Sequence, residues 1–260
     1  MTGFELLAGV VTGLLLGLLG SGGSIVTLPA LVYLAGMDVK TSMAMTFGIV
    51  AITAAFSTIQ HGWNGRVKLS VAAVFGLTGM VGTYLGARMG VWIPDSLQMI
   101  MFASIMLLAA WRMCASQPQP QVAMESGPNA GQFSFRLPHI AVHGVVVGVL
   151  TGMVGVGGGF LIVPALVLLS GLSIRDAVGT SLVVVALKST AGFAGYAGVV
   201  DIDYGMMLGF STVAIVGSLA GAVISDCISG DRLKSVFSVF LIFTACAILL
   251  DSSSEFLEFR

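Results

Sequence analysis

Charge is the scarcest property of this sequence. Only 9% of its 260 residues are Asp, Glu, Lys or Arg, whereas 57% are hydrophobic, so the chain cannot cover itself with a water-soluble surface. The 11 basic and 12 acidic side chains give a net charge of −1 and form no basic patch, which argues against nucleic acid as a partner. We therefore expect an all-helical, polytopic protein whose main partner is the lipid bilayer.

Residues that usually hold metals or carry out catalysis are also rare. The three cysteines have no metal or redox spacing, and neither a P-loop nor a strand–helix alternation suggests a nucleotide site. We expect no metal, no other cofactor, no ATPase subunit and no enzymatic activity. The residues that an intramembrane enzyme could use are dispersed along the chain: His61, Lys188, Asp201 and Asp203.

What the sequence has instead is a series of long apolar stretches. A helix that crosses a bilayer needs about 20 apolar residues. The stretches lie at 4–35, 43–60, 69–92, 96–114, 139–170, 177–199, 204–228 and 233–250. Between them, residues 115–138 are rich in Gln, Pro, Ser and Gly, as is typical of a solvated linker. We divide the chain into a transmembrane unit at 1–114, a cytoplasmic linker at 115–138, a second transmembrane unit at 139–250, and a tail at 251–260 that could be an added extension.

The two transmembrane units are copies of each other. Sliding the sequence along itself by 135 residues, the separation of Gly9 and Gly144, aligns the halves as far as Ala110 without a gap. GLLGSGGSIVTLPAL at 17–31 then falls on GMVGVGGGFLIVPAL at 152–166. Small residues far downstream coincide as well: Gly82 and Gly86 with Gly217 and Gly221. We interpret the chain as a duplication.

The basic residues indicate how the copies lie in the membrane. If 4–35 and 139–170 are hairpins that return to their starting side, most basic residues share one side: Arg66, Lys68, Arg112, Arg136, Arg175, Arg232 and Lys234. Only Lys40 and Arg88, with Arg260 in the tail, lie opposite. This asymmetry fits the positive-inside rule with a cytoplasmic linker. Each half then has one broken or re-entrant helical hairpin plus three transmembrane helices, so the halves are inverted repeats, as in many secondary transporters.

The glycine loops inside the two hairpins are the first candidate site. Unwound backbone is tolerated in a bilayer only where it is buried in protein or lines a polar cavity. A helix start with glycines offers free amide donors to an anion. We therefore predict that two loops bind a small anion: Ser21, Gly22, Gly23 and Ser24 in one, Gly157, Gly158 and Gly159 in the other. Glycines spaced by four, such as Gly9, Gly13 and Gly17, are interpreted as helix-packing residues instead.

Hydroxyl groups and one lysine complete the candidate set. Thr46 and Ser181 occupy equivalent positions in the two halves, and Thr180 precedes Ser181. Their hydroxyls could bond the helix backbone or donate to an oxyanion, and the sequence leaves both open. Lys188 lies in the middle of an apolar stretch, where a cation is costly and usually functional. An anion would be its natural partner, although snorkelling or a neutral amine remains an alternative.

His61 is a candidate for coupling transport to protons. It ends an apolar segment beside Trp63, and a histidine can change its charge near neutral pH. An ordinary loop histidine beside an aromatic residue at the membrane interface is the competing interpretation.

The sequence also resembles a known family. The paired G-x-x-G-x-G-G-G/S-x-x-x-x-P-A-L segments, AVGTSL at 177–182, AGFAGY at 191–196 and GVVD at 198–201 resemble the TauE/SafE membrane permeases. Proteins of this kind are bacterial and archaeal exporters or permeases of sulfite, sulfoacetate and related anions. The first half departs from the pattern, with Ser21 and Ser24 where the second half has Val156 and Gly159.

The resemblance implies a multi-pass carrier of the prokaryotic inner membrane that exports a small sulfur-containing oxyanion by alternating access. An anion channel, or a permease for another small solute, is the alternative. A cation permease is disfavoured because no carboxylate lies in the middle of an apolar stretch. A homodimer is left open.

Overall fold

The computed structural model describes residues 3–19, 23–63, 67–115, 130–155 and 174–227, together with single positions or short runs within 162–172 and 239–248. The described elements are all helical. In lipid, backbone amides and carbonyls must bond within their own segment, and a helix does this for every apolar stretch. The helices are α1 (Gly3–Leu19), α2 (Gly23–Pro29), η1 (Ala30–Leu34), α3 (Val39–Trp63), α4 (Leu69–Gly90), α5 (Asp95–Ala115), α6 (Ala130–Met153), α8 (Ile174–Tyr196) and α9 (Tyr204–Cys227).

Four of these helices are long and apolar enough to cross a membrane. Their apolar spans are Val39–Gln60, Leu69–Gly90, Asp176–Tyr196 and Tyr204–Ser225. Shorter apolar helices lie at Leu6–Leu18, Gly23–Leu34, Asp95–Leu108 and Ala141–Met153. The expectation of an all-helical polytopic membrane protein is confirmed at this level. Helix α6 begins at Ala130, inside the stretch that composition assigned to the linker.

The first apolar stretch, 4–35, is not one helix. It is divided into α1 and the α2–η1 pair, and α2 packs back against α1. The Oγ1 atoms of Thr27 and Thr12 lie 3.4 Å apart, and a Cβ built on Gly23 would lie 2.9 Å from the carbonyl oxygen of Thr12. This close approach requires a residue without a side chain at the start of α2. The broken helix that the sequence predicted is therefore present in the first half.

Two seams of glycine join helices from different halves. Helix α1 packs on α9, and α4 packs on α6. A Cβ on Gly82 would meet the carbonyl of Val145, and a Cβ on Gly217 would meet that of Val10. The two contacts are equivalent, because Gly82 and Val145 correspond to Gly217 and Val10 at the offset of 135 residues. The same offset relates the contacts of further pairs: Gly86 with Gly221, Gly148 with Gly13, and Gly152 with Gly17.

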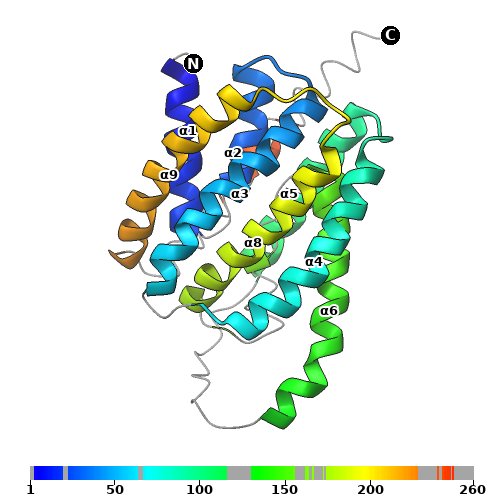
Figure 1. Ribbon diagram of the computed structural model, residues 1–260, viewed down its shortest axis with the longest axis vertical. Coiled ribbons are helices and arrows are strands. Elements are labelled where there is room, and N and C mark those ends of the chain that lie inside the picture. Colours follow the sequence, from blue (N-terminus) through cyan, green and yellow to red (C-terminus); the bar gives the residue numbers. More distant parts are fainter. Residues whose placement is uncertain are drawn as a thin grey trace.

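Helices α3 and α8 form the centre of the molecule and run in opposite directions. In Figure 1, α1, α3 and α9 descend, whereas α4, α6 and α8 rise. Phe47 stacks near Tyr196 with ring centroids 6.1 Å apart, and a Cβ on Gly192 would meet the Phe47 ring. Further along, Ala54 and Val185 belong to one buried cluster. The start of α3 thus lies beside the end of α8.

Ion pairs mark the two ends of this bundle. Lys40, at the start of α3, lies 3.5 Å from Asp95, at the start of α5. Lys68, before α4, lies 3.8 Å from Asp176 near the start of α8. Lys40 and Lys68 therefore lie at opposite ends, as the expected charge distribution requires.

Candidate functional site

Lys188 is fully buried in the middle of α8. Its exposed fraction is 0%, and its Nζ has no hydrogen-bond partner among the described residues. The aliphatic part of the side chain lies on α4, because a Cβ on Gly79 would be 2.9 Å from Cδ of Lys188 and 3.1 Å from its Cγ. A glycine at position 79 thus makes room for the lysine stem. An ammonium group in this position has no counter-charge among the described buried residues, although burial of an unpaired charge is costly.

The facing helix α3 places Thr53 near the same level. Met43 of α3 contacts Tyr196 of α8, and Phe47 of α3 contacts Gly192 of α8. Contacts further along α3 thus involve residues earlier in α8, so the two helices are antiparallel. Continuing this antiparallel register places Thr53 level with Ala186, two residues before Lys188 along α8. The two positions are also equivalents in the duplicated sequence. Thr53 is 1% exposed, and its Oγ1 donates to the carbonyl of Ile49 at 2.7 Å.

Other buried polar atoms also lack partners within the described part of the chain. Ser24 Oγ, in the first turn of α2, and Thr46 Oγ1, in α3, are both 0% exposed and unpartnered. Burying a hydroxyl without a hydrogen-bond partner lowers stability by about 1–3 kcal/mol. Buried polar atoms of this kind therefore usually bind water or a ligand. The remaining unpartnered atoms are carried by Ser42, Ser57, Gln60, Thr83, Gln98 and Ser189.

The predicted hydroxyl set separates into two kinds. Thr180 Oγ1 accepts a hydrogen bond from the backbone N–H of Lys68 at 3.0 Å, and Ser181 Oγ donates to the carbonyl of Val178 at 2.7 Å. Thr46 Oγ1 has no such bond to any described residue. The sequence left open whether these hydroxyls bond the helix backbone or donate to an anion. Thr180 and Ser181 bond the backbone, whereas Thr46 has no partner in the described part of the chain.

Most of the predicted glycine loops lie outside the described residues. This holds for Ser21 and Gly22 in the first half and for Gly157, Gly158 and Gly159 in the second. Gly155, just before the second loop, has a φ of 72°, which side chains other than glycine rarely adopt. A Cβ there would also meet Met43. Gly155, which precedes the second loop, therefore lies against α3 of the first half, at a residue three positions before Thr46.

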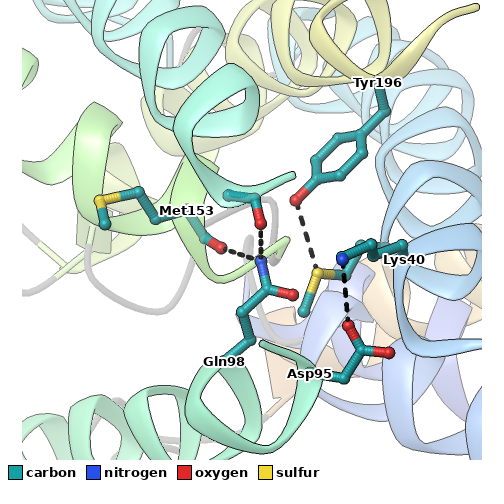
Figure 2. A network of polar contacts seen from close by, with 7 residues as sticks. Lys40, Asp95, Gln98, Met153 and Tyr196 are labelled. Carbon is teal, nitrogen blue, oxygen red and sulfur yellow. Dashed lines mark hydrogen bonds and ion pairs between the residues drawn. The ribbon is translucent and has the colours of Figure 1, made fainter. Parts of the chain in front are cut away.

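A polar network surrounds this same end of the bundle (Figure 2). Gln98 of α5 donates from Nε2 to the carbonyl oxygens of Gly90 and Met153, both at 2.8 Å. It thereby ties the end of α4 to the end of α6, directly before the second glycine loop. Tyr196 points toward the same region, and its hydroxyl lies 3.5 Å from the sulfur of Met43.

Sequence reasoning did not single out Gln98. The sequence contained one indication, a glutamine inside an apolar helix. Such a glutamine is expected to be buried, and a buried amide must find hydrogen-bond partners. In the structure Gln98 is indeed 0% exposed. Of His61 only the backbone is described, at the end of α3, so its role in coupling stays a prediction. Among the described residues, no group of three or more His, Cys, Asp or Glu side chains could hold a metal ion.

Comparison with known proteins gives a consistent result. The family model described as "Sulfite exporter TauE/SafE" matches residues 5–248. A "Probable membrane transporter protein" of Xylella fastidiosa is 29% identical over 246 residues, covering 93% of this chain and 92% of that protein. The "Probable membrane transporter protein YdhB" of Bacillus subtilis is 25% identical, covering 92% and 95%. A "Probable membrane transporter protein" of Haemophilus influenzae is 25% identical, covering 94% and 97%. No solved structure matches this chain significantly.

Proposed function

Since the chain belongs to the TauE/SafE family of membrane transporters, we propose that it is a secondary carrier for a small sulfur-containing oxyanion, sulfite or an organosulfonate, in the prokaryotic inner membrane. The chain is a multi-pass membrane protein, and its relatives are transporters, not enzymes. The family's description names sulfite, and an organosulfonate presents the same sulfur-bound oxygens.

The observation that carries the proposal is Lys188 itself, at 0% exposure and with no partner for its Nζ among the residues that the structure describes. An ionised side chain inside a membrane protein is usually paired or belongs to a transport pathway. An oxyanion supplies the missing charge and several acceptor oxygens. The unpaired hydroxyls of Ser24 and Thr46 are the additional donors in this proposal, together with the glycine loops at 21–24 and 157–159.

The arrangement of the halves supports a mechanism of alternating access. Equivalent helices of the two halves run in opposite directions (Figure 1): α1 and α6, α3 and α8, and α4 and α9. The glycine contacts between α4 and α6 are also repeated by the equivalent residues of α9 and α1. These features support inverted repeats that rock about a central site. In this proposal the site lies beside Lys188, between the central helices α3 and α8, and opens to each side of the membrane in turn.

The membrane potential favours export. It is negative inside, so an anion that leaves the cell gains about 2.3 kcal/mol per charge for each 100 mV. An electrogenic carrier would thus expel sulfite or a sulfonate without an ATPase.

Transport in liposomes tests the proposal. The reconstituted protein is expected to move radiolabelled sulfite or methanesulfonate, and Lys188→Met, which keeps the length and removes the charge, is expected to lower the rate at least tenfold. Thr190→Ala is the matched control, because Thr190 is exposed on the same helix and bonds only Ala186 in the described structure. Monodisperse elution and an unchanged melting temperature establish that each variant is folded.

Two results would overturn the proposal. One is wild-type flux that does not exceed that of protein-free liposomes for either anion. The other is a folded Lys188→Met variant that transports at the wild-type rate, because the charge would then have no part in anion binding.

A further inference from the structure

We propose that the central site selects anions that carry a single negative charge and rejects dianions of the same shape. This inference rests on the proposed function and narrows its substrate class to monoanions such as a monosulfonate or hydrogensulfite. It follows from counting the charges that can reach Lys188.

Lys188 is the only buried charged side chain among the described residues. The nearest acid before it on α8, Asp176, lies about 18 Å away along the helix axis and pairs with Lys68. Asp201 and Asp203 follow the end of α8, and the stretches 6–37 and 141–174, which contain both glycine loops, have no Asp, Glu, Lys or Arg in the sequence. His143 in the second stretch is exposed. Within the described residues, the buried interior therefore offers a single formal positive charge.

The duplication makes this count informative. Thr53 stands in the first half where Lys188 stands in the second, and their helices, α3 and α8, pack against each other. A symmetric pair of lysines would have presented two positive charges to the ligand. The chain has one, and the threonine in the other half bonds its own helix backbone.

Charge balance then decides which anions fit. A monoanion beside Lys188 leaves the buried site neutral, whereas a dianion leaves one uncompensated negative charge in a region of low dielectric constant. Hydroxyl donors such as those of Ser24 and Thr46 bond oxygen atoms of either anion, so they do not remove this difference.

Two pairs of anions isolate charge from shape. Methanesulfonate and sulfate share the tetrahedral sulfur and differ in one methyl group and one charge. Isethionate and sulfoacetate differ mainly in a carboxylate. Titration calorimetry and thermal shift of the detergent-solubilised protein at one pH and constant ionic strength are expected to give at least tenfold tighter binding of the monoanion in each pair.

Adding the second charge should change this preference. Thr53→Lys is expected to reduce or reverse the ratio of methanesulfonate to sulfate affinity, whereas Thr53→Val, which removes only the hydroxyl, is expected to keep it. If Thr53→Lys does not fold, the exchange variant Lys188→Thr/Thr53→Lys carries the test, because it restores one central charge and should again prefer monoanions over Lys188→Thr alone.

The outcomes separate this inference from the proposed function. Wild-type protein that binds sulfate as tightly as methanesulfonate, or a folded Thr53→Lys variant with an unchanged ratio, overturns monoanion selection and leaves anion transport standing. Failure of every anion to bind or be transported overturns both.

Discussion

Replacing Gly82 with alanine should loosen the seam between α4 and α6. A Cβ at this position would lie 3.0 Å from the backbone nitrogen of Val149 and closer still to the carbonyl of Val145. Both atoms belong to backbone, so no side chain can rotate away and the helices must separate. Overpacking of this kind costs about 1–3 kcal/mol, and we expect the upper end because two helix axes must move.

Part of that loss is offset within α4 itself. Alanine in a helix interior is about 0.5–1 kcal/mol more favourable than glycine, so the net destabilisation is about 2 kcal/mol. For a chain of this size, that corresponds to a fall in melting temperature of about 4–8 °C. The measurement is thermal unfolding in detergent, followed by the loss of monodisperse protein.

The duplication supplies a matched variant and the structure supplies a control. Gly217→Ala should cause the same fall, because a Cβ there would lie 3.0 Å from the backbone nitrogen of Leu14, the equivalent of Val149. Gly62→Ala has no atom within 4 Å of the new Cβ and should leave the melting temperature unchanged or raise it slightly. Equal melting temperatures for Gly82→Ala and Gly62→Ala would refute the reasoning.

Two further predictions concern the ends of the bundle. Gln98→Leu removes both hydrogen bonds to the carbonyls at the ends of α4 and α6, so the free energy of unfolding is expected to fall by about 2 kcal/mol. Ser104→Ala, at an exposed position on the same helix, is the control. Equal melting temperatures for the two variants would contradict the bridging role of Gln98. Gln98→Glu should be no better than Gln98→Leu, because a carboxylate cannot donate to either carbonyl; recovery of wild-type stability would count against the assignment. Thr180→Val should lower the free energy of unfolding by about 1 kcal/mol, because it removes the hydrogen bond from the Lys68 backbone. Lys68→Ala breaks only a partly exposed ion pair with Asp176 and should change the free energy of unfolding by less than about 0.5 kcal/mol. A larger loss for Lys68→Ala than for Thr180→Val in the same melts would contradict this order.

Much of the fold could be predicted from the sequence because membrane insertion simplifies the problem. The apolar stretches gave the positions of α3, α4, α5, α8 and α9, and the break at GSGGS gave the division of the first stretch into α1 and α2. The start of α6 was missed, because its first residues are polar and resemble a linker. Composition does not distinguish a solvated linker from the solvated first turns of a helix.

The partners of the glycines could not be predicted from spacing. A repeat of four identifies a close-packing face on α1 but does not say which helix it meets. That Gly13 and Gly17 lie on α9 of the other half depends on the arrangement of all the helices.

The candidate site was only partly predictable, for a related reason. The charge of Lys188 in an apolar stretch was visible in the sequence, but Gly79, which makes room for it, was not. The bond from the Lys68 backbone to Thr180 joins residues 112 positions apart, and no local pattern reports such a contact. Gln98 was missed because one buried amide gives little indication of its partners until the helices around it are placed.

The role proposed for Lys188 would account for the difference between the two halves at this position. Contacts far from the crossing of α3 and α8, such as those at Gly82 and Gly217, occur twice without interfering, so both copies keep them. A second lysine at position 53, which lies level with Ala186 of α8, would add another cation to a medium of low dielectric constant, where like charges repel strongly. Two threonines would leave an anion without a counter-charge. In the proposed carrier, one lysine and its equivalent threonine would keep the symmetry of the two halves while supplying a single charge to the substrate.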